Sequence, residues 1–399
     1  MHRTRLGYIA LEGINSFATT IYFYYLPFIM KEHYGFSDRD NLLVTAMHGA
    51  IYIFASWQGG RLSERWGPFR ALRVGYFGMA LALVFGLCVP QVVGQIVAIA
   101  AWTVPLCLIW PTLEAMVSRA TTVKETARLV GLYNLVWAGT NALAFNCGGW
   151  LLQTLAVGGL DHRQVLYGVT LVFMVFQFLL TVWLERRHRG EPMPCVAEAA
   201  LAPHSPEAAA FQQAVSPKRF LQMAWVANPF AYMALNSLGA LLPRLAGRFE
   251  LTTAEAGMIF SLWLYARAAS FVLLWQWTGW HYRFRWLALA FAGLAGSFLA
   301  MLFVPYLWMV IVAQGIFGFA VGLMYYSSLF YSVDVGDTKT EHSGLHEAAI
   351  GLGTFAGPLL GATTITLLPQ QPGGGALAIT GLLLTGLGPL VWLRLRKSK

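Results

Sequence analysis

The chain has 399 residues, of which 57% are hydrophobic and only 11% charged, and its mean hydropathy is +0.57. Soluble globular proteins carry about 25% charged residues, so this chain has too few to cover a surface that faces water. The composition therefore excludes a soluble protein and predicts a chain whose solvent is lipid.

Apolar segments of membrane-spanning length follow one another along the chain. A helix needs about 20 mostly apolar residues to cross a hydrocarbon core of about 30 Å. Because helices satisfy their own backbone hydrogen bonds in lipid, we predict an all-α membrane protein with twelve transmembrane helices. The twelve segments are 6–30, 42–60, 70–90, 92–118, 129–155, 164–184, 220–243, 253–277, 285–305, 307–333, 344–368 and 375–393.

The basic residues predict the orientation of these spans. With a cytoplasmic N-terminus, 21 of the 27 lysines and arginines fall on the cytoplasmic side, 5 fall outside, and Arg267 lies within a span. This asymmetry is what the positive-inside rule describes. We therefore expect both termini in the cytoplasm. The net charge of +9 then needs no nucleic-acid partner to explain it.

One long segment between spans, residues 187–218, is rich in alanine, proline and glutamate. We interpret it as a flexible cytoplasmic linker. It divides the chain into an N-terminal six-helix bundle, residues 1–186, and a C-terminal six-helix bundle, residues 219–399. The four cysteines lack the spacing of a metal site, and we expect free thiols.

The two halves contain similar residues at a constant offset. Asn15-Ser-Phe-Ala in the first span matches Asn228-Pro-Phe-Ala in the seventh, 213 positions later. At the same offset, Gly131-Leu and Gly148 of the fifth span match Gly344-Leu and Gly361 of the eleventh. These matches favour two six-helix bundles related by a pseudo-twofold axis, as in rocker-type secondary transporters.

The loop after the second span reads Gly60-Arg-Leu-Ser-Glu64-Arg65-Trp-Gly67-Pro-Phe-Arg70. It resembles the loop signature of the major facilitator superfamily: a glycine, an acidic–basic pair, a second glycine and a further basic residue. Glu64 stands where aspartate is usual, and only one basic residue follows. With the twelve spans and the paired halves, the resemblance covers the whole chain. It implies a secondary transporter in which this loop acts as a breakable latch between inward-facing and outward-facing states.

A second stretch, in the eleventh span, resembles the glycine–proline pattern that typically marks the fifth span of antiporters in that superfamily. It consists of Gly344, Gly353, Gly357-Pro358 and Gly361. The fifth span has Ala144-Phe145 where glycine–proline would fall, so the displaced copy does not establish antiport. We expect these glycines to let helices pack closely, and the proline to permit a bend.

Polar and ionisable residues inside spans are the candidate site, because charges at membrane depth are costly unless they face protein or water. We predict a substrate and proton pathway that uses Glu12, Asn15, Glu114, Asn134, Arg267, His346 and Glu347. Each has a simpler alternative. Arg267 could lock two helices by pairing with a carboxylate, Glu12 and Glu114 could reach toward cytoplasmic arginines, and His346-Glu347 could start a helix at the interface.

These residues suggest a mechanism. A carboxyl group in a low-dielectric cavity can take up a proton near neutral pH. A glutamate beside a fixed arginine would then let a proton and an anionic or polar solute compete for one charge. We predict a proton-coupled transporter of a small organic solute that works by rocker-switch alternating access. We expect a monomer without cofactor or metal, in a bacterial inner membrane.

Two other functions stay open at this point. The 15 tryptophans and 26 phenylalanines could line the cavity of a multidrug efflux antiporter. In a different class, the fold could serve as a membrane sensor or scaffold that transports nothing. We expect no enzyme, because position 350 is not the second histidine of a zinc helix and no phosphate-binding loop is present.

Overall fold

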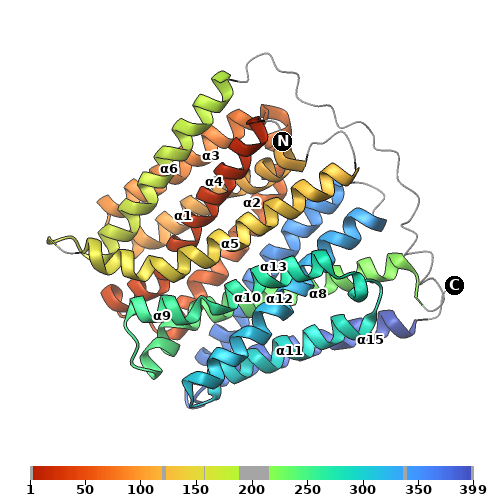
Figure 1. Cartoon of the computed structure of the whole chain (residues 1–399). Helices are drawn as coiled ribbons and strands as arrows, with labels where there is room; N and C mark the ends of the chain where they lie inside the picture. The colour runs from red at the N-terminus through yellow and green to blue at the C-terminus, as the bar shows by residue number, and fades with distance from the viewer. Residues whose placement is uncertain (1–2, 119–122, 157, 188–214, 336–338, 397–399) are drawn as a thin grey trace. The chain divides into compact units, whose positions relative to one another are not determined.

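The structure is a computed structural model that describes residues 3–118, 123–156, 158–187, 215–335 and 339–396 (Figure 1). Within these ranges it does not describe the side chains of residues 3–5, 118, 123–127, 130, 333–335 and 339–346. All the regular secondary structure of the described residues is helical. The predicted all-α class is therefore confirmed.

Ten of the twelve predicted segments coincide with one helix each in the described part of the chain. These are α1 (Arg3–Tyr34), α2 (Asp38–Trp66), α3 (Pro68–Cys88), α4 (Val92–Ser118), α5 (Val123–Leu155), α6 (His162–Arg187), α8 (Pro217–Arg248), α11 (Phe284–Phe303), α12 (Leu307–Val335) and α13 (Lys339–Leu367). Most of them extend beyond the apolar segment, because a helix continues into polar residues that its caps stabilise.

The eighth and twelfth segments are each long and apolar enough to span a membrane, and each contains a short interruption between two helices. The eighth consists of α9 (Thr253–Phe260) and α10 (Leu262–Gln276), followed by the short η1 (Thr278–Trp280). The hydroxyl of Ser261, between them, donates to the carbonyl of Met258 three residues earlier, 2.9 Å away. A serine that bonds locally to the backbone competes with the regular helical pattern. The twelfth consists of α14 (Gly374–Thr385) and α15 (Leu387–Leu395).

The chain forms two compact units, each described by itself. The first contains residues 1–35, 54–201 and 251–261, and the second contains 36–53, 202–250 and 262–399. Each unit therefore includes one segment from the other half of the sequence: α9 joins the first unit, and the first half of α2 joins the second. The division into bundles at 1–186 and 219–399 stays a prediction. Most of the 187–218 linker lies outside the described residues.

In the first unit, α1 lies between α5 and α6, and α3 packs against α4 and α6 (Figure 1). Aromatic side chains fill the centre: the ring centroids of Tyr22 and Trp102 are 4.9 Å apart, and the hydroxyls of Tyr22 and Tyr167 are 3.3 Å apart. α9 packs closely on α5, since a Cβ at Gly149 would lie 2.5 Å from the carbonyl oxygen of Thr253. This contact joins residues from opposite halves of the sequence.

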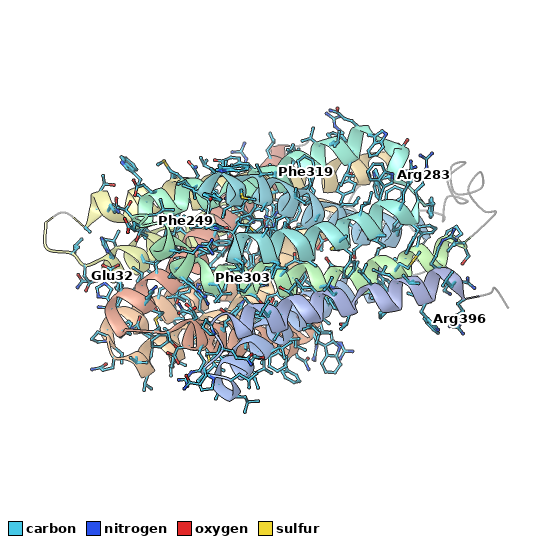
Figure 2. The ribbon with its side chains drawn as sticks, turned by 90° about the horizontal axis from the view of Figure 1, so that it is seen from below. Glu32, Phe249, Arg283, Phe303, Phe319 and Arg396 are labelled. Atoms are coloured by element: carbon cyan, nitrogen blue, oxygen red, sulfur yellow. The ribbon has the colours of Figure 1, made fainter. Side chains whose placement is uncertain are left out.

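In the second unit, α8 packs against α12 and α13, and α10 packs against α12. Arg283 and Arg396 lie at one end of this unit, and Phe249 and Phe303 lie toward the other (Figure 2). The arginines come from segments predicted to be cytoplasmic. Phe249 comes from a segment predicted to be outside, and Phe303 lies near the predicted outer end of the ninth span. The helices of this unit therefore run up and down between two ends, as repeated membrane crossing requires.

Eight helical segments of the described chain are long and apolar enough to cross a membrane, judged by length and composition. On α6, an exposed stripe with helical spacing consists of Val172, Phe176, Leu179 and Trp183. Such a stripe suits lipid and not water. The helices α1, α2, α5 and α8 are also long but less apolar. They hold most of the buried polar side chains considered below. Twelve crossings and cytoplasmic termini stay predictions.

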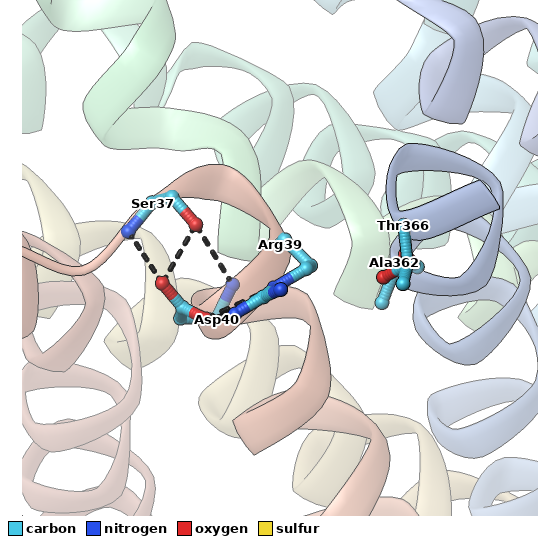
Figure 3. A network of polar contacts seen from close by, with 5 residues as sticks. All are labelled: Ser37, Arg39, Asp40, Ala362 and Thr366. Carbon is cyan, nitrogen blue, oxygen red and sulfur yellow. Dashed lines mark hydrogen bonds and ion pairs between the residues drawn. The ribbon is translucent and has the colours of Figure 1, made fainter. Parts of the chain in front are cut away.

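α2 begins with a capping box (Figure 3). The hydroxyl and backbone amide of Ser37 donate to Asp40 Oδ2 at 2.7 and 3.0 Å, and the amide of Asp40 donates to the Ser37 hydroxyl at 3.4 Å. This arrangement satisfies amides at the helix start that have no partner within the helix. Ala362 and Thr366 of α13 lie near this start, in the same unit.

Candidate functional site

Glu12 is the centre of a polar cluster in the first unit. Its side chain is fully buried, in the first third of α1. The hydroxyl of Ser16, one turn later on the same helix face, donates to Glu12 Oε1 at 2.6 Å. The hydroxyl of Tyr133 on α5 donates to Glu12 Oε2 at 2.9 Å. Both carboxyl oxygens are therefore engaged by neutral donors.

A second carboxyl group lies near Glu12. Glu114 on α4 is partly buried, and the two carboxyl groups interact electrostatically. The buried hydroxyl of Tyr76 on α3 also interacts electrostatically with Glu12, and it forms no hydrogen bond to any described atom. In the described part of the chain no ion pair joins Glu12 to a basic side chain, so its alternative role as an anchor toward cytoplasmic arginines has no contact to support it.

The asparagines of this unit differ in their partners. Asn15 follows Glu12 by three residues on α1 and is fully buried, yet neither Nδ2 nor Oδ1 has a hydrogen-bond partner among the described atoms. Asn141 on α5 accepts a bond of 2.8 Å from the Thr20 hydroxyl. Asn134, the residue directly after Tyr133 on α5, is also buried. A buried amide without partners is rare in proteins and marks Asn15 as a candidate binding group.

An apolar groove of about 550 Å³ runs along α1, beside the face that carries Glu12. Ile9, Gly13 and Phe17 of α1 line it, with Val136 of α5 and Phe173 of α6. At about 100° per residue, Ile9, Gly13 and Phe17 lie about 60°, 100° and 140° around α1 from Glu12. The groove therefore flanks the face of α1 that carries Glu12, and its lining is apolar.

Arg267 is the charged centre of the second unit. It is almost fully buried on α10, with its guanidinium carbon 5.5 Å from the centroid of the Trp263 ring. The backbone around it is tightly packed, since a Cβ at Gly318 of α12 would lie 3.0 Å from the Arg267 amide. Glu12 belongs to the first unit and Arg267 to the second, so a direct relation between them stays a prediction.

Glu347 is buried, with 8% of its surface exposed, and accepts a hydrogen bond of 2.5 Å from the hydroxyl of Tyr52 on α2. α13 begins eight residues earlier, at Lys339, so the alternative in which Glu347 starts a helix at the interface is wrong. The side chain of His346 lies outside the described residues. Sequence reasoning missed Tyr52 and the buried His48 one turn before it, although a histidine within an apolar span was a visible signal.

The fold and the family can be compared with known proteins at this point. The Major Facilitator Superfamily profile matches residues 9–335. The chain belongs to this superfamily. No curated protein matches the sequence. Membership identifies a multi-pass integral membrane protein that transports a small-molecule substrate across a bilayer, and not an enzyme.

Solved structures of transporters share this fold. The nucleoside transporter NupG superimposes with a TM-score of 0.71 at 11% identity, covering 99% of this chain and 100% of NupG. The tetrameric PepTSo2 gives 0.71 at 14% identity, with 98% and 96% covered. The human organic anion transporter MFSD10 gives 0.67 at 15% identity, with 97% and 99% covered. Identities this low support the fold and not the substrate.

The superfamily motif, predicted as a loop, is mostly helical: Gly60 to Trp66 form the last turns of α2, and only Gly67 separates α2 from α3. Gly67 has a φ of +81°, a backbone conformation that favours glycine, and it precedes Pro68 in the first turn of α3. Glu64 and Arg65 are exposed and form no ion pair within the described chain. Arg70 lies over the ring of Trp66 at 5.6 Å, and a Cβ at Gly60 would meet nothing within 4 Å. The latch stays a prediction.

The glycine–proline pattern places α13 against its neighbours. A Cβ at Gly353 would lie 2.4 Å from the carbonyl oxygen of Pro229 on α8, and one at Gly357 would lie 2.9 Å from Met233. A Cβ at Gly361 would meet Ile379 of α14 at 2.7 Å. The helix runs through Gly344 and continues past Pro358 to Leu367. These glycines therefore allow close packing, as expected.

One group in the described chain has the composition of a metal site. The potential ligand atoms of Glu32, His33 and His162 lie within 4.8 Å of one another. His162 Nδ1 is 3.0 Å from Glu32 Oε1, and both side chains are substantially exposed. An ion pair between two of the three residues accounts for the grouping without a metal.

Proposed function

We propose that the protein is a proton-coupled secondary transporter of a small polar or anionic organic solute. The burial of Glu12 between neutral donors carries this proposal. An ionised carboxylate in that place would lack a positive partner among the described residues. Burial therefore favours the protonated, neutral form of Glu12. A group that must exchange a proton when its surroundings change is what coupling requires.

The neighbourhood of Glu12 supports a proton shared with a second acid. Glu12 and Glu114 interact, and two ionised carboxylates near each other repel. A proton on either group therefore stabilises both. We propose these two residues as the coupling pair, with His346 and Glu347 on the proton pathway of the second unit.

Polar groups near these acids support the choice of solute. The buried amide of Asn15 offers a donor and an acceptor, and Asn134 lies on the neighbouring α5. We propose that these amides bind the solute, and that Arg267 binds its anionic group when it has one. Two of the similar structures named above are a nucleoside transporter and an organic anion transporter, and polar or anionic groups are found in both classes of solute.

The proposal of alternating access rests on two segments, each of which packs on a helix from the other half of the sequence. The first half of α2 packs on α13, and α9 packs on α5. In the predicted orientation both contacts lie on the outer side. Their opening would expose the pathway to the outside, and the α2–α3 loop would act on the cytoplasmic side. We propose that the protein works as a monomer in a bacterial inner membrane.

The test uses proteoliposomes that contain the pH-sensitive dye pyranine. Uridine, alanylalanine and p-aminohippurate are added separately, and dye fluorescence reports proton movement. We expect one of these solutes to change the internal pH, and Glu12→Gln to abolish that change, because glutamine keeps the shape but cannot ionise. Glu32→Gln, at the exposed end of the same helix, is the matched control and should retain the signal.

Proton movement at the parent rate in Glu12→Gln would contradict the role of Glu12. Uptake of a solute without proton movement would contradict coupling itself.

A lipophilic solute is the second candidate, because the groove beside α1 is apolar over about 550 Å³. This volume suits a drug-sized ligand. Ethidium efflux from the same proteoliposomes, lost in Phe17→Ser and retained in Glu12→Gln, would favour this candidate over the first.

A further inference from the structure

α2 changes its packing partners near its middle. Its first half, up to Ile53, belongs to the second unit, and its second half, from Phe54, belongs to the first. In the second unit, a Cβ at Gly49 would lie 2.4 Å from the Phe355 amide of α13. In the first unit, the hydroxyls of Ser63 and Thr112 on α4 are 2.5 Å apart. A single helix therefore serves both units.

The Tyr52–Glu347 hydrogen bond lies next to this change of partners. Tyr52 is 3% exposed and immediately precedes Ile53, whose backbone lies about 3.1 Å from a Cβ placed at Gly351, one turn after Glu347. From there the contact continues through Gly49 to Leu42, which lies beside Gly361. The hydrogen bond is thus at the inner end of a close α2–α13 contact that is otherwise apolar or made by backbone.

The described groups around Glu347 include no positive partner for its carboxyl. α2 presents Tyr52 and the buried His48, whose ring centroids are 5.9 Å apart. α8 presents Tyr232 near Gly353, the tyrosines of α12 pack on Phe271 and Tyr232, and α14 has no titratable side chain. Within the described chain no basic side chain forms an ion pair with Glu347.

A neutral carboxyl group and an ionised one differ sharply in this position. The neutral group can accept the Tyr52 hydrogen bond and stay buried. Among the described residues the ionised group has one donor, the neutral Tyr52 hydroxyl, and a buried charge without a positive partner strongly favours any arrangement that admits water. Loosening of the packed contact around Tyr52 would admit more water to Glu347, which is 8% exposed.

We propose that Glu347 is a proton-binding site that controls the α2–α13 contact: its protonated carboxyl keeps the first half of α2 packed on α13, and ionisation releases it. The place of this event in a transport cycle rests on the proposed function. The release of α2 from α13 can be measured without any solute. The experiment below therefore tests this contact separately from the proposed transport function.

The experiment labels Leu42→Cys with N-ethylmaleimide. Leu42 is fully buried beside Gly361. Cys107, Cys147 and Cys195 are replaced by serine, and the exposed native Cys88 is retained. The reactivity of both thiols rises with pH, so the labelling rate at position 42 is divided by the rate at Cys88 in the same molecule. This ratio reports the opening of the α2–α13 contact. We expect the ratio to rise about tenfold between about pH 5.5 and about pH 8.5.

Two variants separate the explanations. In Glu347→Gln the ratio should stay low at both pH values, since the amide cannot ionise. In Tyr52→Phe it should rise further than in the parent at the higher pH, since the ionised carboxylate loses its donor. A flat ratio in the parent, or the parental pH dependence in Glu347→Gln, would overturn the proposal. Thr45→Cys, on the same half of α2, is the second reporter if Leu42→Cys does not fold.

Discussion

Asn15 of α1 and Asn228 of α8 are both fully buried, 213 positions apart, at equivalent places in the two halves of the sequence. Each half of the sequence therefore buries an amide at this position of the predicted repeat, where burial of an apolar residue would cost less free energy. For Asn15 the described structure supplies no hydrogen-bond partner to either amide atom. Its retention is easier to explain by binding than by stability.

The first prediction follows from this residue. Asn15→Leu should raise the free energy of unfolding by about 1 kcal/mol or more, because it removes an unsatisfied buried group. The same variant should lose the solute-driven proton signal. Thermal unfolding in detergent, followed by tryptophan fluorescence, measures the first effect, and the pyranine assay measures the second.

Asn141→Leu is the matched control for Asn15→Leu. It removes the acceptor of the Thr20 hydroxyl and should lower stability by about 1–3 kcal/mol. If Asn15→Leu proved as destabilising as Asn141→Leu, the Asn15 amide would have partners in the folded protein, and its assignment as a binding group would be wrong.

The second prediction concerns the close contact of α2 with α13. A Cβ at Gly49 would lie 2.4–2.8 Å from the backbone of Thr354 and Phe355, which cannot move as a side-chain end could. Gly49→Ala should therefore destabilise the protein by about 1–3 kcal/mol. The same unfolding measurement tests it.

Gly139→Ala, in the middle of α5, is the comparison for Gly49→Ala. Nothing lies within 4 Å of its added Cβ, so alanine should be neutral or stabilise the helix by up to about 1 kcal/mol. Equal effects of the two substitutions would show that the α2–α13 contact is looser than described.

The third prediction uses the charge at the start of α2. Burial alone would raise the pKa of Asp40, but hydrogen bonds from Ser37 and Arg39 and the charge of Arg39 outweigh it, so the pKa lies below its ordinary value. A lowered pKa means that the ionised form stabilises the folded state. This contribution is complete above the unfolded pKa of about 3.9 and is lost as the pH falls through the folded pKa.

Asp40→Asn should therefore lower the Tm at neutral pH, by an amount equivalent to about 0.3–1 kcal/mol. The difference from the parent should shrink as the pH falls below about 4. Glu64→Gln, which changes an exposed carboxyl without an ion pair in the described chain, should leave the Tm unchanged. A difference for Asp40→Asn that does not vary with pH would refute the charge as its cause.

Much of the fold could be predicted from the sequence because lipid imposes a simple rule. Each span must be a helix of about 20 apolar residues, so composition and length located all twelve segments. The interruptions at Ser261 and Gly386 were not visible. Ser261 accepts a hydrogen bond from Asn146, 115 positions away, and Gly386 lies against the rings of Phe291 and Phe230. Local apolar character does not record such contacts.

Some residues of the candidate site could likewise be predicted from the sequence, and others could not. Glu12, Arg267 and Glu347 could be selected from the sequence, because an ionisable side chain at membrane depth is conspicuous wherever it points. Ser16 could also have been selected, since it lies one turn from Glu12. The donors Tyr133 and Tyr52 could not, because each comes from a helix whose packing partner is fixed only by the folded chain.

The sequence by itself determined the membrane class, the helix positions and the superfamily, because these follow from local hydrophobicity and short motifs. Only the tertiary structure decided that α2 packs on α13 in one half and on α4 in the other, and that Tyr52 meets Glu347. The physical reason is that burial is a property of one residue and can be read from its surroundings in sequence, whereas a hydrogen bond or a close backbone contact depends on two segments that meet only in the folded protein.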